Sequence, residues 1–490
     1  MRPPLSNTFD TTSLAGLFAE ARTRLTDYLT PSVRLGVTGL ARSGKTVFIT
    51  ALVRSLVAGG RLPFFSPEAE GRIVRAYLEP QPDDAVPRFE YEAHMATLEG
   101  TPPQWPDSTR RVSELRVTIE YQSANAIKRT LGLSKLHLDI VDYPGEWLID
   151  LPLLAQSYQA FSNEALKLAR DPLRADIAKA WLDFIAGTDP GGSEDERIAR
   201  DGARLYTGYL RAARDRETLS TLAPGRFLMP GDLEGSPLLT FFPLPLTSQE
   251  APPRGSLAAM MVRRFESYKS EVVRPFFKDH FSRLDRQIVL VDVLGALDAG
   301  AEALVDLDRA MEGVLKAFRP GANSWLSVIM GRRIDKVLFA ATKADHLPAA
   351  SHDRLAAILK VIIDSAAERA AAQGAGVATL ALAAVRATRE TEVKIGKDVL
   401  PCLKGTPLAG ETVDGHVYDG TEEAAIFPGD LPADPQAALD AARIAKAGSL
   451  HLVRFAPPRL KPKGADAATP ALPHIRLDRA LEFLISEDLT

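Results

Sequence analysis

The sequence contains a single cysteine, Cys402, among 490 residues, and only eight histidines. One cysteine excludes a disulfide within the chain and a cysteine cage for a metal, and its rarity is typical of a reducing compartment. The histidines form no His-Glu-x-x-His string and no close pair, which argues against a catalytic zinc site. Disulfide-stabilised folds and cysteine-bound metal sites are therefore excluded, and a catalytic zinc site is not expected.

Strong net charge and long apolar stretches are also lacking. The chain has 59 basic and 63 acidic residues, a net charge of −4, so no overall attraction to nucleic acid is expected. No apolar run approaches the ~20 residues that a membrane span needs, and the first residues lack the apolar core of a secretory signal. The sequence predicts a cytoplasmic protein without a membrane span, whose membrane contact would come only through a partner.

The apolar segments are short runs separated by helical patterns. Runs of this kind are buried on both faces of a parallel sheet, and their alternation with helices predicts a doubly wound, mostly parallel α/β fold. A long hairpin is expected to join the second and third strands. The predicted strands cover 33–37, 112–121, 136–143, 287–294, 336–343 and 377–385.

A long helical stretch divides these strands into two groups. Its residues carry the 3.6-residue period and contain no run like the buried strands, which indicates a helical insertion. An amphipathic helix is also predicted at 13–29. The predicted organisation is a first part of the core domain at 1–148, the insertion at 149–284, the second part of the core at 285–392, a small irregular region at 393–475 and a closing helix at 476–490.

The stretch GLARSGKT, residues 39–46, lies between an apolar strand and an apolar helix. It fits the P-loop pattern G-x-x-x-x-G-K-[ST], in which glycines let backbone N–H groups surround phosphate oxygens at a helix N-terminus. We expect Lys45 to reach the β- and γ-phosphates and Thr46 to ligate Mg²⁺, whereas Arg42 either touches phosphate or points to solvent. The predicted phosphate-binding residues are Gly39, Arg42, Ser43, Gly44, Lys45 and Thr46.

A P-loop protein also needs an acidic residue at the end of a neighbouring strand, which holds the magnesium ion through water. Two D-x-x-G strings follow predicted strands and begin at Asp142 and Asp292. Asp142 is preferred because it ends the third strand and precedes the insertion, and Asp292 remains the alternative. In the preferred string, the Gly145 N–H would sense the γ-phosphate.

The string Thr342-Lys343-Ala344-Asp345 ends another apolar strand and matches the guanine-reading pattern [NT]-K-x-D. An aspartate accepts hydrogen bonds from the N1–H and 2-amino groups of guanine, and adenine offers neither donor. The stem of Lys343 can lie along the base. By position alone, Ala384 lies where a backbone N–H meets the guanine carbonyl. GTP and GDP are the predicted ligands, and the alternative is an ATPase in which this string is only a turn.

The loop before residue 112 is expected to supply a threonine that completes the magnesium shell when the γ-phosphate is present. Thr109 is preferred, with Ser108 and Thr101 as alternatives. The adjoining Arg110 and Arg111 either act as an arginine finger in cis or form a solvated surface.

Glu146 follows the preferred D-x-x-G string, where many small GTPases have glutamine. A carboxylate can accept a hydrogen bond from the attacking water but cannot donate one to the γ-phosphate. Hydrolysis is therefore expected to be slow and dependent on a partner, or else Glu146 acts as a general base. Lys45, Gly145 and Glu146 are the predicted catalytic residues. A scaffold that binds nucleotide without turnover remains a further alternative.

Five strings together resemble the YcjX-like P-loop GTPases of bacteria, and the resemblance covers nearly the whole chain. They are GLARSGKT, DYPGEW, ATKAD, FLMPGDLEGSPLLTFFPL and PHIRLDRALEFLI. The resemblance implies a Ras-like G domain with a helical insertion, a stress-associated cytosolic role and an inner-membrane partner of the YcjF type. It also implies that Lys45 and Thr46 contact phosphate and magnesium and that Lys343 and Asp345 contact the base. It favours Asp142 over Asp292.

Overall fold

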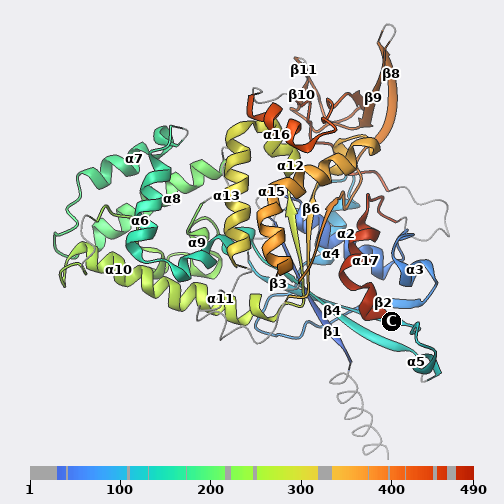
Figure 1. Ribbon diagram of the computed structural model, residues 1–490, viewed down its shortest axis with the longest axis horizontal. Coiled ribbons are helices and arrows are strands. Elements are labelled where there is room, and N and C mark those ends of the chain that lie inside the picture. Colours follow the sequence, from blue (N-terminus) through green and yellow to red (C-terminus); the bar gives the residue numbers. More distant parts are fainter. Residues whose placement is uncertain are drawn as a thin grey trace, which may run out of the picture.

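A seven-stranded sheet forms the centre of the molecule in the computed structural model (Figure 1). The structure describes residues 30–39, 42–107, 111–130, 132–172, 174–215, 222–246, 251–317, 334–372, 375–395, 398–413, 415–444, 450–460 and 471–490. The strands are β1 (Ser32–Gly39), β2 (Ile73–Glu79), β3 (Ser113–Tyr121), β4 (Ser134–Asp142), β5 (Arg286–Val291), β6 (Lys336–Ala341) and β7 (Gly376–Ala381). The helix predicted at 13–29 lies outside the described residues.

The strand order is β2-β3-β4-β1-β5-β6-β7. From β4 to β7 all neighbours are parallel, whereas β2, β3 and β4 pair antiparallel. The expected hairpin is the β3–β4 pair, in register from Ser113 opposite Asp142 to Tyr121 opposite Ser134. The predicted mostly parallel α/β fold of the Ras-like type is confirmed, with β2 as an added edge strand.

Alternate residues of the central strands face opposite layers of helices, as the pleat of a strand requires. Ile288 and Leu290 of β5 pack in the same core as α2, α4 and α17. Val289 and Val291 pack in the core that contains α13, α15 and the helices between β4 and β5. The helices around the sheet are α2 (Lys45–Val57), α3 (Ser66–Ala69), α4 (Tyr91–Leu98), α5 (Ala126–Thr130), α12 (Val293–Ala299), α13 (Ala301–Ala317), α15 (His352–Ala372) and α17 (Leu477–Ile485).

Between β4 and β5 the described residues form helices and turns but no strand (Figure 1). The segment begins with a 3-10 helix, η1 (Gly145–Ala155), and continues with α6 (Tyr158–Ala169), α7 (Ala175–Ala186), α8 (Glu196–Asp215), α9 (Gly225–Leu228), α10 (Leu257–Tyr268) and α11 (Arg274–Asp279). Its core is aromatic and includes Trp181, Phe241 and Phe242, which are almost fully buried. The ring of Phe242 lies where a side chain at Gly202 would stand, which brings the loop before α10 against α8.

The segment after β7 is more regular than the sequence predicts. It contains a three-stranded antiparallel sheet, β12-β9-β8, formed by β8 (Arg389–Ile395), β9 (Asp398–Gly405) and β12 (Ala424–Ile426), and a short pair, β10 (Thr412–Val413) and β11 (His416–Val417). The sequence of β8, RETEVKI, is mostly polar because the strand is largely exposed, so it lacks the apolar run by which the central strands are recognised. Helix α16 (Pro435–Ile444) follows, and α17 packs against the sheet and is followed by a 3-10 helix, η8 (Ser486–Leu489).

Candidate nucleotide-binding site

A cleft of 1720 Å³ opens at the carboxyl ends of the parallel strands, where ligands of doubly wound folds bind. It is lined by the loop after β1 and the first turn of α2, by the loops after β4, β6 and β7, and by parts of the insertion and of the C-terminal region. The volume exceeds the ~300–1,000 Å³ typical of a small-molecule site. The cleft therefore extends beyond the space that one nucleotide needs.

The loop after β1 has the geometry of a phosphate cradle. Gly44 has a φ of +83° and precedes α2, whose first turn carries no acidic residue. A side chain at Gly39 would stand 2.1 Å from Ser43 Oγ and 2.9 Å from the Leu290 carbonyl oxygen, so this position requires glycine. The Ser43 hydroxyl is buried and has no hydrogen-bond partner among the residues that the structure describes. The open N–H groups at the N-terminus of α2 and this hydroxyl suit an anion.

Lys45 and Asp142 meet at the floor of this cradle. Asp142 ends β4, directly beside β1, and the Lys45 ammonium forms an ion pair with its Oδ1 atom. The other oxygen, Oδ2, is buried and finds no hydrogen-bond partner in the described part of the chain. A phosphate would compete for Lys45, and the second carboxylate oxygen would then be available to a cation or its water shell.

The residues at this point fit a magnesium ion, which prefers oxygen ligands and keeps several waters. Thr46 lies buried in the first turn of α2, and the unpartnered Asp142 oxygen provides the negative charge. Within the described ranges no group of three or more His, Cys, Asp or Glu side chains could hold a metal by itself. Phosphate oxygens and water would therefore have to complete the shell. Thr109, the other predicted ligand, and its alternative Ser108 lie outside the described residues, but the flanking Asp107 and Arg111 line the cleft.

Asp292, the alternative to Asp142, has a different environment. It follows β5 and is the N-cap residue of α12. Its Oδ1 accepts a hydrogen bond of 3.0 Å from the Gly295 N–H, and its Oδ2 pairs with the Lys343 ammonium at 2.5 Å. Both oxygens are therefore occupied, and Asp292 holds Lys343 of the string 342–345 in place. Of the two aspartates, Asp142 is the better placed for magnesium.

The string 342–345 forms the other end of the cleft. Lys343 has a φ of +59°, and Asp345 is buried with its Oδ2 held by the Ala387 N–H at 2.9 Å. Its second oxygen, Oδ1, accepts no hydrogen bond from the described residues. Thr342 is anchored through its N–H to the Val291 carbonyl at 2.9 Å. Ala384 lies in the wall beside this string, so the structure brings the four predicted base-binding residues together.

Sequence reasoning missed the aromatic wall of this end of the cleft. Trp105, His346 and Phe455 line it together with Leu408 and Arg454. The Trp105 indole N–H donates to the Phe455 carbonyl at 2.7 Å, and the Phe455 ring lies 5.7 Å from that of His346. Burial lowers the pKa of His346, so the imidazole is neutral near pH 7. Trp105 and Phe455 lie in proline-rich segments that carry no periodic pattern and no known motif.

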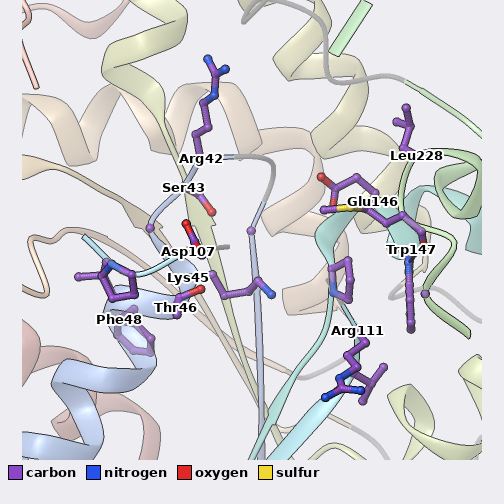
Figure 2. A pocket seen from close by; sticks show the side chains of 18 of the residues that line it. Arg42, Ser43, Lys45, Thr46, Phe48, Asp107, Arg111, Glu146, Trp147 and Leu228 are labelled. Atoms are coloured by element: carbon purple, nitrogen blue, oxygen red, sulfur yellow. Dashed lines mark hydrogen bonds between the residues drawn. The ribbon is translucent and has the colours of Figure 1, made fainter. Parts of the chain in front are cut away.

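The loop after β4 forms the side of the cleft across from α2. Figure 2 shows Glu146, Trp147 and Leu228 on that side, and Thr46 and Phe48 on the other, with the Arg42 side chain directed away from both Lys45 and Thr46. Arg42 is exposed. The Glu146 carboxylate lines the cleft and makes no hydrogen bond with the described residues. Gly145 is buried at the start of η1.

Hydrogen bonds to a buried carboxylate connect the insertion to the loop after β4. Asp150 of η1 accepts hydrogen bonds from the Gly225 N–H at 2.7 Å, the Arg226 N–H at 3.3 Å and the Tyr268 hydroxyl at 2.5 Å. Burial raises the pKa of Asp150 to about 6. In addition, the Trp147 indole N–H donates to the Met229 carbonyl at 3.2 Å. Residues 225–229 therefore lie directly against the segment that follows Asp142.

None of the helices within the described residues is long and apolar enough to cross a membrane.

Comparison with known proteins finds relatives that align with nearly the whole chain. Residues 33–489 match the family described as "YcjX-like family, DUF463". A protein named "Ras-like GTPase YcjX" from Escherichia coli (strain K12) is 39% identical over 467 aligned residues, which cover 93% of this chain and 96% of that protein. A protein of the same name from Shewanella oneidensis (strain ATCC 700550 / JCM 31522 / CIP 106686 / LMG 19005 / NCIMB 14063 / MR-1) is 32% identical over 487 aligned residues, with 93% and 94% covered. This chain belongs to the YcjX-like family.

Proposed function

We propose that this protein binds GTP and GDP with Mg²⁺, hydrolyses GTP slowly and acts as a switch that responds to the bound nucleotide. The observation that carries the proposal is the position of Asp345 at the end of a cleft that begins at the P-loop. One oxygen of its buried carboxylate accepts from the Ala387 N–H, and the other accepts no hydrogen bond from the described residues. The two relatives named as Ras-like GTPases support it.

Different residues along the cleft would contact the phosphates, the magnesium ion and the base. Lys45 would move from Asp142 to the β- and γ-phosphates, while Thr46 and Asp142 would hold a magnesium ion that neutralises charge on those phosphates. Lys343, kept in place by Asp292, would lie along the base, and Asp345 would accept the two guanine donors. The Ala384 N–H would meet the guanine carbonyl.

Slow hydrolysis follows from Glu146, which can accept a hydrogen bond from water but cannot donate one to phosphate. A scaffold protein that binds GTP without hydrolysing it would also have Glu146 at this position. A measurement of phosphate release distinguishes such a scaffold from a slow GTPase. The resemblance to the family supports a role in a bacterial stress-related process and a protein partner at the inner membrane, of the YcjF type. Such a partner would recruit a protein that otherwise stays in the cytoplasm.

The test is Mg²⁺-dependent binding of fluorescent GDP, competed separately by GTP, ATP and xanthosine nucleotides. We expect GTP but not ATP to compete, and Asp345→Asn to shift preference toward xanthosine nucleotides, whose 2-oxo group accepts the amide N–H. Asp183→Asn, an exposed position on α7 that pairs with Lys179, is the matched control and should bind like wild type. Equal competition by ATP, with no effect of Asp345→Asn, would assign the protein to the ATPases.

A further inference from the structure

The wall of the cleft that belongs to the insertion carries three arginines. Arg211 and Arg214 lie on α8, and Arg226 lies on α9. Arg211 is exposed, and Arg214 makes two distant contacts, an ion pair of 3.8 Å with the neighbouring Asp215 and a contact of 3.9 Å from its Nη1 to the Met229 sulfur. Arg226 differs from both because it is nearly buried, with 11% of its side chain exposed, and is held against the loop after Asp142. It is therefore the cation whose position is best defined.

Three contacts fix where Arg226 lies. Its guanidinium carbon stands 3.2 Å from the centre of the Trp147 ring, a stacked cation–π arrangement. Its backbone N–H donates to Asp150. The preceding Gly225 is packed so closely that an added Cβ would stand 2.0 Å from the Glu146 carbonyl oxygen. Arg226 is thus attached to the residues that directly follow Gly145, the predicted sensor of the γ-phosphate.

The guanidinium lacks the partners that a buried arginine normally has. Toward the described residues only Nη1 donates, to the Pro230 carbonyl and to Asp232 Oδ1, both at 3.4 Å, and the Asp232 side chain is 85% exposed. The N–H groups on Nε and Nη2 have no acceptor among the described residues. Burial lowers the pKa of Arg226, a sign that its desolvation is not offset.

Arg174 shows the contrast with a buried arginine of structural type. Its side chain is 3% exposed and its Nη2 donates to the buried Asp306 at 2.6 Å. Such a pair offsets the cost of burying the charge within the fold. The carboxylates near Arg226 are Asp150, which accepts its backbone N–H, and the exposed Asp232 at 3.4 Å. Among the described residues no short ion pair like that of Arg174 holds the Arg226 guanidinium, which lines the nucleotide cleft. An anion that enters the cleft would complete its hydrogen bonds.

We propose that Arg226 is a catalytic residue for GTP hydrolysis, an arginine finger that the helical insertion supplies in cis. The inference rests on the proposed GTPase function. Water attacks the γ-phosphorus, the bond to the β–γ bridging oxygen breaks, its electron pair stays on the GDP oxygen, and the proton of the water passes to the phosphate. Arg226 would donate from Nε and Nη2 to the oxygens on which charge accumulates during this step. The stack on Trp147 ties its approach to the arrangement of the DYPGEW loop.

The test uses the full-length chain with Arg226→Gln and Arg226→Lys. Single-turnover GTP hydrolysis should slow by roughly 10²- to 10³-fold in Arg226→Gln, which is within the range for losing a transition-state cation. GDP affinity should stay within about 3-fold, because the finger acts on the transition state rather than the ground state. The GDP–aluminium fluoride complex, which mimics that state, should form with wild type and not with Arg226→Gln.

Control variants distinguish a transition-state contact of Arg226 from a general loss of positive charge or a loss of side-chain packing. Arg214→Gln removes a charge from the same wall, and Arg263→Gln removes an exposed arginine of α10 that pairs with Glu194. Both should hydrolyse GTP within about 2-fold of wild type. Arg226→Lys keeps the positive charge and the alkyl stem but lacks the bidentate guanidinium donor. This variant should therefore fold normally and hydrolyse GTP little faster than Arg226→Gln.

The outcomes are distinct. Wild-type rates and an intact aluminium fluoride complex in Arg226→Gln would overturn the inference while leaving the GTPase assignment standing. Equal losses in Arg214→Gln would also overturn it, since the effect would then be one of general charge. If Arg226→Gln fails to fold, Arg226→Lys decides, and wild-type turnover in that variant refutes the role of the guanidinium. Wild-type protein that binds but does not hydrolyse GTP would refute the proposed turnover itself.

Discussion

Replacement of Gly225 by alanine tests how tightly the insertion is coupled to the loop after Asp142. The added Cβ would stand 2.0 Å from the Glu146 carbonyl oxygen and 2.5 Å from its carbonyl carbon, whereas real Cβ contacts are essentially never below 3.0 Å. The obstacle is backbone, which cannot rotate away. One of the two segments must therefore shift by about 1 Å, the difference between 3.0 and 2.0 Å.

The expected cost is about 1–3 kcal/mol of stability, the usual range for an overpacked contact. The shift also weakens the 2.7 Å hydrogen bond from the Gly225 N–H to Asp150 and displaces Glu146 relative to the γ-phosphate. A misplacement of ~1 Å near the reacting atoms can lower turnover by about 10²-fold. GDP affinity should change by less than about 3-fold, since the P-loop and Asp345 belong to other segments of the chain. Single-turnover GTP hydrolysis and fluorescent GDP binding measure both quantities.

Gly208→Ala is the matched control. Gly208 lies on α8 of the same insertion, and an alanine Cβ there would meet nothing within 4 Å. A helical glycine replaced by alanine is expected to stabilise by about 0.5–1 kcal/mol. If Gly225→Ala keeps wild-type turnover and stability, residues 225–229 are not coupled to the loop after Asp142, and the placement of Arg226 loses its basis.

Two further predictions concern buried carboxylates. Burial raises the pKa of Asp150 from 3.8 to about 6, so the folded state holds this proton more tightly than the unfolded state. This contribution to stability is present below pH 4 and is lost as the pH rises to about 6, a change of about 3 kcal/mol. Urea denaturation at pH 4.5, 6 and 7.5 measures it, and an unchanged pH dependence in Asp150→Asn would contradict the assignment. Asp292→Asn keeps the cap of α12, because asparagine caps as well as aspartate, but it removes the ion pair with Lys343. GDP should then dissociate roughly 10-fold faster in stopped flow at nearly unchanged stability, and a wild-type dissociation rate would show that Lys343 needs no support.

The parts of the site that could be predicted are those whose chemistry is local. Residues 39–46, Asp142 and the string 342–345 each combine a contiguous pattern with a strand end, and parallel strands place such ends at one edge of the sheet. The central strands were recognisable because burial on both faces requires continuous apolar runs.

The parts that could not be predicted depend on contacts between distant segments. Trp105 and Phe455 are 350 residues apart and meet through one hydrogen bond, which no pattern in either segment encodes. The stacking of Arg226 on Trp147 likewise depends on how the insertion folds, and no local sequence pattern predicts it. The polar strand β8 resembles a loop in its sequence because most of its described residues are exposed. Sequence reasoning therefore identified residues that the structure brings into one cleft, and which we propose to bind phosphate and base, but it did not identify the walls around them.

The sheet order also has a consequence for how the chain folds. The central strand β1 has β4 on one side and β5 on the other, and Leu35 pairs with Arg286 across the whole insertion. The P-loop strand therefore acquires its second neighbour only after nearly 300 residues have been synthesised. Pairing over such a separation is slow because a long loop must close before the contact forms. Until β5 has been synthesised, the edge of β1 that will pair with β5 is exposed, and either the insertion or a chaperone would have to cover it.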